Sequence, residues 1–202
     1  MPHYTLGRPK YTKGQNLSWS EILLLPDVDA SRFDFASSKA VELTINDSSI
    51  FLPGGGKPQI GFRRAGLVMG NGSDASNVGV RTFHWSVQQE PQKRMNLTHE
   101  NNDVVWMTEI EWDDWQNFAV TLDYEKNTLQ VWYSLRYEPL RAVTKALQND
   151  DSGGGQYQIG MAKKPTETVG VVYDGFQESG IHEGQIYGGI FIENSSGGCI
   201  SK

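Results

Sequence analysis

Apolar and polar residues alternate along short stretches of this chain, which is the pattern of β-strands with one buried face. The alternation is clear over residues 41–45 and again over residues 79–87. Residues 118–124 and 128–134 show it on both sides of Glu125-Lys126-Asn127, a polar sequence typical of a turn. This part of the chain is therefore predicted to be a β-hairpin.

Helical periodicity is sparse. Residues 140–149 are predicted to form one short helix, and residues 18–25 a turn or two of helix. Many strands at short spacing, separated by turns rich in Gly, predict an all-β fold, either a β-jelly roll or a two-sheet antiparallel sandwich. A chain of 202 residues suits one domain with a sizeable core, so residues 1–202 are predicted to be a single domain.

Composition and charge narrow the class of ligand. Aromatic residues make up 11% of the chain, which suits an aromatic-lined surface and disfavours disorder. The net charge of −6 disfavours nucleic acids and anionic membranes as partners, because both bind basic surfaces. An uncharged polysaccharide meets no electrostatic objection. Cys199 is the only cysteine, and the N-terminal residues contain no apolar run, so neither an internal disulfide nor a signal peptide is expected in this chain.

Two short motifs contain polar residues that are candidates for substrate binding or catalysis. In Phe62-Arg63-Arg64 the two arginines face opposite ways on a strand, so Arg63 can point into a groove, or can be a surface cation paired with an acid. In the second motif Glu100 follows His99. No second His stands at helical spacing, so no metal is expected here. A Glu in an apolar groove can act on a glycoside as acid or nucleophile, although a lone Glu is more often a solvated surface residue.

Tryptophans and carboxylates occur together in the middle of the chain. Trp106 and Trp112 stand near Glu109 and Glu111, and such a combination is what a sugar groove needs, because rings stack on sugar faces and carboxylates accept hydroxyl hydrogen bonds. Trp115 leads into an apolar run and is predicted to belong to the core instead.

The segment from Glu183 to residue 193 is a second candidate groove strand. Alternation places Glu183, Gln185 and Tyr187 on one face, with Gly184 and apolar residues on the other. Without side chains, the Gly188-Gly189 pair would let a flat ligand approach the backbone closely. The alternative is a hairpin whose polar face is simply solvated. No phosphate-binding loop, dinucleotide fingerprint or Cys/His cluster appears, so no cofactor is expected.

Ordered blocks along most of the chain resemble fungal glycoside hydrolase family 131, the β-glucan-degrading enzymes. The most specific block is Gly175-Phe176-Gln177-Glu178-Ser179-Gly180-Ile181, followed by residues 183–191. The resemblance implies a β-jelly roll with a concave glycan-binding face, hydrolysis of β-1,3-, β-1,6- and β-1,4-linked glucans, and secretion by a fungus. The other matching blocks are residues 32–34, 49–55, 61–65, 80–86, 97–100, 115–124, 149–153, 155–157 and 163–165.

The chain departs from the family pattern at two places. Family members carry a longer stretch between the His-Glu motif and the Trp-x-Asn-Phe-Ala motif, where this chain has only residues 101–114. The family's Gly-Gln-Tyr-His is Gly-Gln-Tyr-Gln here, so Gln158 replaces a histidine that can carry a proton. The shortened stretch puts the second catalytic carboxylate in doubt.

The motifs and the resemblance together give candidate roles to individual residues. Glu100 is the first catalytic candidate, and Glu183 or Glu109 could complete the pair of carboxylates that glycoside hydrolysis requires. The predicted substrate-binding residues are Arg63, His99, Trp106, Gln158, Gln177 and Tyr187.

Three functions remain open at the level of the sequence. The first is a β-glucan hydrolase, expected to be an extracellular monomer with β-glucan as its partner. The second is a non-catalytic glycan-binding relative that has lost part of the active site. The third is a polysaccharide lyase, in which Tyr187, Arg63 and Lys163 would serve as base and cations, although the acidic chain disfavours an anionic substrate.

Overall fold

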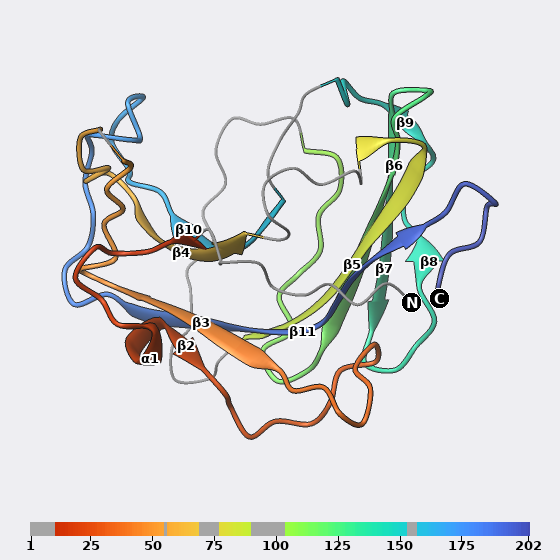
Figure 1. Cartoon of the computed structure of the whole chain (residues 1–202), viewed down its shortest axis with the longest axis horizontal. Helices are drawn as coiled ribbons and strands as arrows, with labels where there is room; N and C mark the ends of the chain where they lie inside the picture. The colour runs from red at the N-terminus through yellow and green to blue at the C-terminus, as the bar shows by residue number, and fades with distance from the viewer. Residues whose placement is uncertain (1–10, 55, 69–76, 90–103, 153–156) are drawn as a thin grey trace. The chain divides into compact units, whose positions relative to one another are not determined.

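The computed structural model describes residues 11–54, 56–68, 77–89, 104–152 and 157–202. Within these residues the chain is almost entirely antiparallel β-structure, in one sheet of three strands and one of eight, with a single short helix (Figure 1). The predicted all-β, two-sheet antiparallel fold is confirmed. The chain divides into two compact units, and the single-domain organisation stays a prediction.

The first unit comprises residues 1–24, 42–74 and 155–185. Its three-stranded sheet has the order β1-β4-β10, and β10 is antiparallel to β4 with Lys163 opposite Arg63 in register. The second sheet begins in this unit with β2 paired to β3, which is followed in strand order by β11. The strands are β1 (Tyr11–Thr12), β2 (Leu23–Leu24), β3 (Val41–Asn46, in this unit from residue 42), β4 (Arg63–Val68), β10 (Gln158–Lys163) and β11 (His182–Asn194, in this unit up to residue 185).

The helix α1 (Trp19–Ile22) confirms the turn of helix predicted over residues 18–25. The backbone N–H of Ser18 donates to the Glu21 carboxylate at 2.6 Å, which satisfies a donor at the start of the helix. Ile22 is fully buried, as are Leu43 and Ile45 on β3, so α1 and β3 place apolar side chains in the core of the first unit.

The second unit comprises residues 25–41, 75–154 and 186–202. Here the strand order continues from β11 through β5-β6-β7-β8, and β9 also pairs with β7. The predicted hairpin is confirmed: the carboxylate of Asp123 accepts hydrogen bonds from the N–H groups of Glu125 and Lys126, and Asn127 adopts a φ of 52°. The strands are β5 (Val80–Gln89), β6 (Gln116–Asp123), β7 (Thr128–Leu135), β8 (Arg141–Ala142) and β9 (Leu147–Gln148).

The helix predicted over residues 140–149 is wrong, because this stretch forms β8 and β9 instead. Both short strands pair with β7, and Val143 donates its N–H to the carbonyl of Val131 at 3.0 Å. The hydroxyl of Thr144 also accepts the N–H of Val131 at 2.9 Å. The open edge of β7 thus offers the segment backbone partners that a short isolated helix would lack.

A buried histidine lies on β5 in the second unit. The side chain of His84 is 0% exposed, and its Nε2 lies 2.6 Å from Oε1 of Glu193 on β11. The ring stacks on Phe191 at 4.2 Å between centroids, and Phe33 contacts its edge at 5.3 Å. Nδ1 is buried and has no hydrogen-bond partner among the described residues. Burial therefore lowers the pKa of His84, although the hydrogen bond and charge of Glu193 act in the opposite direction.

This histidine makes stability depend on pH. The unfolded chain protonates a histidine near pH 6.5, whereas the folded chain does so only at lower pH, so the unfolded state binds more protons between the two values. We expect the free energy of unfolding to fall as the pH drops below about 6.5, by at most about 1.4 kcal/mol per pH unit from this group. Urea unfolding of wild type and His84→Gln at pH 7.5 and 5.5 checks it. The variant should show the smaller decrease, and an equal decrease in both proteins would contradict the assignment.

Candidate active site

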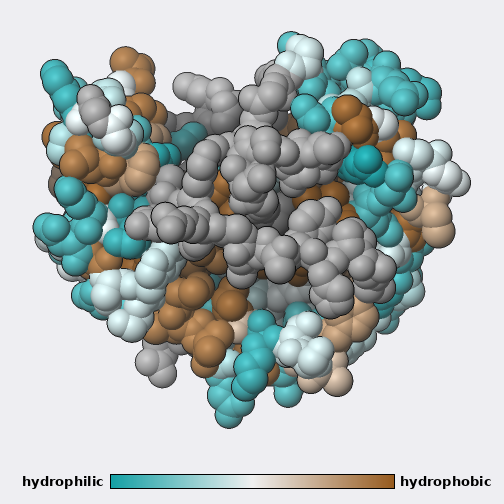
Figure 2. Space-filling model, viewed as in Figure 1, coloured by the Kyte–Doolittle hydropathy of each residue, from teal (hydrophilic) through white to brown (hydrophobic). Residues whose placement is uncertain are grey.

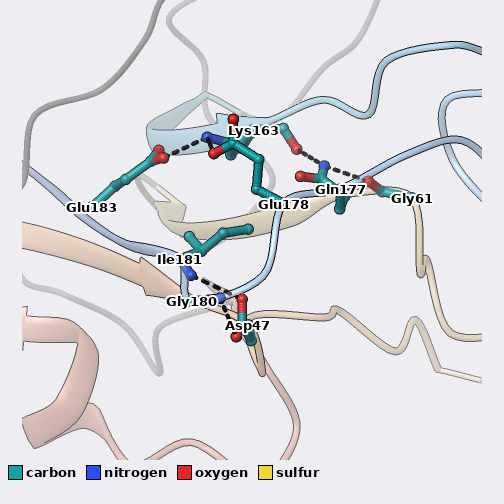
Figure 3. A network of polar contacts seen from close by, with 8 residues as sticks. All are labelled: Asp47, Gly61, Lys163, Gln177, Glu178, Gly180, Ile181 and Glu183. Atoms are coloured by element: carbon teal, nitrogen blue, oxygen red, sulfur yellow. Dashed lines mark hydrogen bonds and ion pairs between the residues drawn. The ribbon is translucent and has the colours of Figure 1, made fainter.

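A buried carboxylate and a partly buried ammonium meet in the first unit. Glu183 is the second residue of β11 and is 8% exposed, and Lys163 is the last residue of β10. Nζ of Lys163 lies 2.5 Å from Oε1 of Glu183, and the two side chains are 15% and 10% exposed (Figure 3). A charge-assisted hydrogen bond of this kind is strong, and it compensates two charges that would be costly to bury singly.

Lys163 has a second carboxylate partner. Its Nζ also donates to Oε2 of Glu178 at 3.2 Å, but that side chain is 57% exposed. Burial by itself would lower the pKa of Lys163, and the hydrogen bonds and charges of Glu183 and Glu178 outweigh that effect, so its pKa lies above the usual range. Lys163 is therefore a permanent cation between a buried and an exposed carboxylate.

The second oxygen of Glu183 is unsatisfied. Oε2 is buried and has no hydrogen-bond partner among the described residues. A buried carboxylate oxygen without a donor is costly and uncommon in folded proteins. Such an oxygen can accept a hydrogen bond from a water molecule or a ligand hydroxyl, and this is the chemical property expected of a catalytic or sugar-binding carboxylate.

The segment before β11 is fixed by side chains that bind backbone. The amide Nε2 of Gln177 donates to the carbonyls of Gly61 at 2.7 Å and Lys163 at 3.1 Å (Figure 3). The carboxylate of Asp47 accepts the N–H groups of Gly180 at 2.8 Å and Ile181 at 3.0 Å. These two backbone hydrogen bonds lower the pKa of Asp47, so the turn leading into Glu183 is anchored to an ionised side chain.

These contacts refine the prediction for Gln177. Both hydrogens of its amide are used by backbone carbonyls, so only its oxygen is left for a ligand. Sequence reasoning did not identify Asp47 as a partner of the turn, because Asn46-Asp47-Ser48 has the composition of any turn. Its partners lie more than 130 residues away in the chain, since Gly180 and Asp47 are separated by 133 positions.

Two other predicted residues lie on the three-stranded sheet. Arg63 is the first residue of β4, and its Nη1 donates to the carbonyls of Ile60 at 2.8 Å and Phe62 at 3.0 Å, while its Nε is buried without a partner among the described residues. Gln158 is the first residue of β10 and is exposed. Their roles in substrate binding stay predictions.

A cluster of aromatic rings lies in the second unit. Trp85 on β5 stacks on Phe118 of β6, with centroids 5.6 Å apart and planes 9° apart. Tyr133 on β7 lies 5.2 Å from Phe118, and Trp106 lies 4.8 Å from Tyr133. These four rings are only partly buried. Trp106 thus belongs to an aromatic group whose remaining exposed ring surface can contact a sugar.

Exposed apolar side chains also occur in the first unit. Ile60, Tyr173 and Phe176 are each more than half exposed, at 54%, 52% and 55%. Apolar groups appear in separate patches among hydrophilic ones on the face shown in Figure 2. Phe176 directly precedes Gln177, whose amide donates to the backbone carbonyl of Lys163.

The remaining predicted positions differ in exposure. Glu109 is exposed, and its backbone carbonyl accepts a hydrogen bond from Nε2 of Gln116 at 2.9 Å. Tyr187 is 4% exposed, and burial raises the pKa of its hydroxyl. Trp115 is 5% exposed, as predicted for a core residue. Glu100 and His99 lie outside the described residues.

The Gly188-Gly189 pair does not lie open to a ligand, and that prediction is wrong. Cβ atoms built at these positions would lie 2.6 Å from Oδ2 of Asp34 and 2.4 Å from Cβ of Phe33, respectively. The N–H of Gly189 donates to Oδ1 of Asp34 at 2.9 Å. The absent side chains make room for residues 31–34 of the same chain.

The described residues show neither a metal-binding cluster nor a membrane-spanning helix. No group of three or more His, Cys, Asp or Glu side chains there is arranged to hold a metal ion. None of the helices in that part of the chain is long and apolar enough to cross a membrane.

The chain matches the family model of the glycoside hydrolase 131 catalytic N-terminal domain over residues 5–104 and 100–198. A search of curated protein sequences gives no match. Among solved structures, a family 131 β-glucanase catalytic domain from Podospora anserina matches with a TM-score of 0.76 and 17% identity, over 97% of this chain and 87% of that one. The catalytic domain of a family 131 protein from Coprinopsis cinerea matches with a TM-score of 0.66 and 14% identity, over 97% and 86%. Because the family model covers almost the whole sequence, the chain belongs to glycoside hydrolase family 131.

Proposed function

We propose that this glycoside hydrolase acts on β-1,3-, β-1,6- and β-1,4-linked glucans of cell-wall polysaccharide. Its family is that of a catalytic domain, and the similar protein from Podospora anserina is described as a β-glucanase. A neutral glucan is compatible with the net charge of −6. The observation that carries the proposal is the buried Glu183 carboxylate, with one oxygen on Lys163 and the other unsatisfied.

Hydrolysis of a glycoside requires two carboxyl groups, roughly 5–9.5 Å apart depending on the mechanism. We assign the proton-donating role to Glu100, on the His-Glu motif of the resemblance. Glu183 is assigned the role of base or nucleophile, because its Oε1 accepts a hydrogen bond from the Lys163 ammonium and its Oε2 has no donor among the described residues. In this scheme Glu100 protonates the glycosidic oxygen as the bond to the anomeric carbon breaks. That carbon is attacked either by a water that Glu183 deprotonates, or by the Glu183 carboxylate. In the second case a water deprotonated by Glu100 then hydrolyses the glycosyl-enzyme and frees Glu183. Glu109 is the alternative partner.

Substrate binding is assigned to the residues with aromatic surface or free hydrogen-bonding groups. Trp106 contributes ring surface together with its aromatic neighbours, and Arg63 contributes the buried Nε that has no partner among the described residues. His99, Gln158, Gln177 and Tyr187 complete the set on the basis of the family resemblance. We also propose that the protein is a monomer secreted by a fungus, as that resemblance implies.

The proposal is tested by reducing-sugar release from laminarin, pustulan and barley β-glucan, measured with the purified protein and a Glu100→Gln variant. We expect release by the wild type on at least one glucan, and a loss of about 10²–10⁴-fold in the variant, the range for removal of an acid–base group. Equal rates in the two proteins would remove Glu100 from the mechanism. Absence of release from all three glucans would contradict the proposed substrate class.

A second candidate is a glycan-binding relative without activity. It is favoured by one observation: the family match is in two pieces that meet at residues 100–104, where the shortened stretch begins. Binding to insoluble glucan, with no sugar released from any of the three substrates, would support this candidate. A lyase is disfavoured by the acidic chain and would be recognised by the absorbance of an unsaturated product from a uronate polymer.

A further inference from the structure

We propose that Lys163 is a positioning residue for Glu183, which holds Oε1 of that carboxylate on its ammonium and leaves Oε2 to accept a hydrogen bond from a sugar hydroxyl or a water molecule. The effect on rate rests on the proposed glucan hydrolysis. The contact itself rests only on the geometry of the first unit.

The contact is short, buried and formed by regular structure. The 2.5 Å pair joins the last residue of β10 to the second residue of β11, so both side chains leave strands rather than loops. Side-chain exposures of 15% and 10% mean that little solvent screens the two charges. Without Lys163, the buried Glu183 carboxylate would have no cation among the described residues to hold Oε1 in place.

No other charged group around the pair duplicates this role. Glu178 contacts the same ammonium but adds negative charge. Arg63, opposite Lys163 in register, directs its Nη1 to backbone carbonyls. Asp47 is occupied by two backbone N–H groups. Among the described residues, Lys163 is the one cation with an ion pair to Glu183.

The arrangement defines what each oxygen of Glu183 can do. Oε1 accepts the hydrogen bond of the Lys163 ammonium. Oε2 has no partner among the described residues, so its lone pairs can accept a hydrogen bond from a sugar hydroxyl or a water molecule. Fixing Oε1 therefore fixes the direction in which Oε2 can act as an acceptor or a base.

The test compares Lys163→Met, which removes the charge at similar length, with Lys163→Arg, which retains it. We expect Lys163→Met to lower kcat about tenfold or more, with KM changed less than about threefold, because Oε1 would lose the ammonium that fixes its place. Lys163→Arg should restore most of the rate. Glu178→Gln is the matched control and should leave kcat within about threefold of the wild type, since its pair with Lys163 is exposed.

A second readout does not depend on activity. The ¹³C chemical shift of the Glu183 side-chain carboxyl carbon, assigned with the Glu183→Gln variant, should change in Lys163→Met and be largely restored in Lys163→Arg. An unchanged kcat or an unchanged chemical shift in Lys163→Met, with the protein folded, would overturn the inference. If the wild type releases no sugar, the proposed function fails, and the chemical shift still decides the role of Lys163.

Discussion

Replacing Glu183 by Gln is expected to lower kcat on the preferred β-glucan by about 10²–10⁴-fold while the protein remains folded. Gln has nearly the same shape, so the substitution leaves no cavity. It removes the charge that Oε1 presents to Lys163 and the basicity of Oε2, which is the buried oxygen without a partner among the described residues. Lys163 keeps the exposed carboxylate of Glu178 at 3.2 Å, so the ammonium is not left alone. The measurement is initial-rate kinetics at several pH values, with thermal unfolding to confirm that the variant is folded.

Glu109 is the alternative second carboxylate, and its surroundings differ from those of Glu183. Glu109 is exposed on a segment without strand structure, whereas Glu183 is held on β11 with a fixed cation. A Glu109→Gln variant assayed in parallel therefore decides between them. If the rate is lost in Glu109→Gln and kept in Glu183→Gln, the second catalytic carboxylate is Glu109 and the Glu183–Lys163 pair is structural.

Much of the fold could be predicted because its signals are local. Alternation over residues 79–87, 118–124 and 128–134 corresponds to β5, β6 and β7, and the polar Glu125-Lys126-Asn127 sequence makes the turn between two of them. The helix predicted over residues 140–149 failed for a non-local reason. The backbone of this segment pairs with the edge of β7. Pairing with a distant strand cannot be read from the sequence pattern of the segment itself.

The candidate site could be predicted only in part, for the same reason. Glu183 and Gln177 were found through the block that contains them, but their partners were not. Lys163 lies 20 residues before Glu183, at the end of another strand, and Asp47 lies in a different part of the chain. Ion pairs between strands follow from sheet register, which alternation alone does not fix. The Gly188-Gly189 pair was misjudged because a missing side chain does not tell whether a ligand or the protein itself fills the space.

The close packing at Gly189 predicts the second large effect, a loss of stability on substitution. Gly189 has a φ of +56°, and a Cβ there would lie 2.4 Å from Cβ of Phe33 and 3.0 Å from Oγ of Ser31. Ala at this position would combine left-handed backbone strain with a clash against a buried turn, so we expect Gly189→Ala to lower the free energy of unfolding by about 2–5 kcal/mol.

Gly198 offers a control in the same unit that separates the two causes. Its φ is +76°, but no atom lies within 4 Å of a Cβ built there, so Gly198→Ala carries the backbone strain without the clash and should cost about 1–2 kcal/mol. Urea unfolding of both variants measures the difference, which is the contribution of close packing against Phe33 and Ser31. Equal losses would mean that residues 31–34 yield to the methyl group. Because that space is occupied by the chain itself, the folded fraction of Gly189→Ala should bind insoluble glucan as the wild type does. Weaker binding by the folded variant would mean that Gly188-Gly189 lines the glycan groove after all.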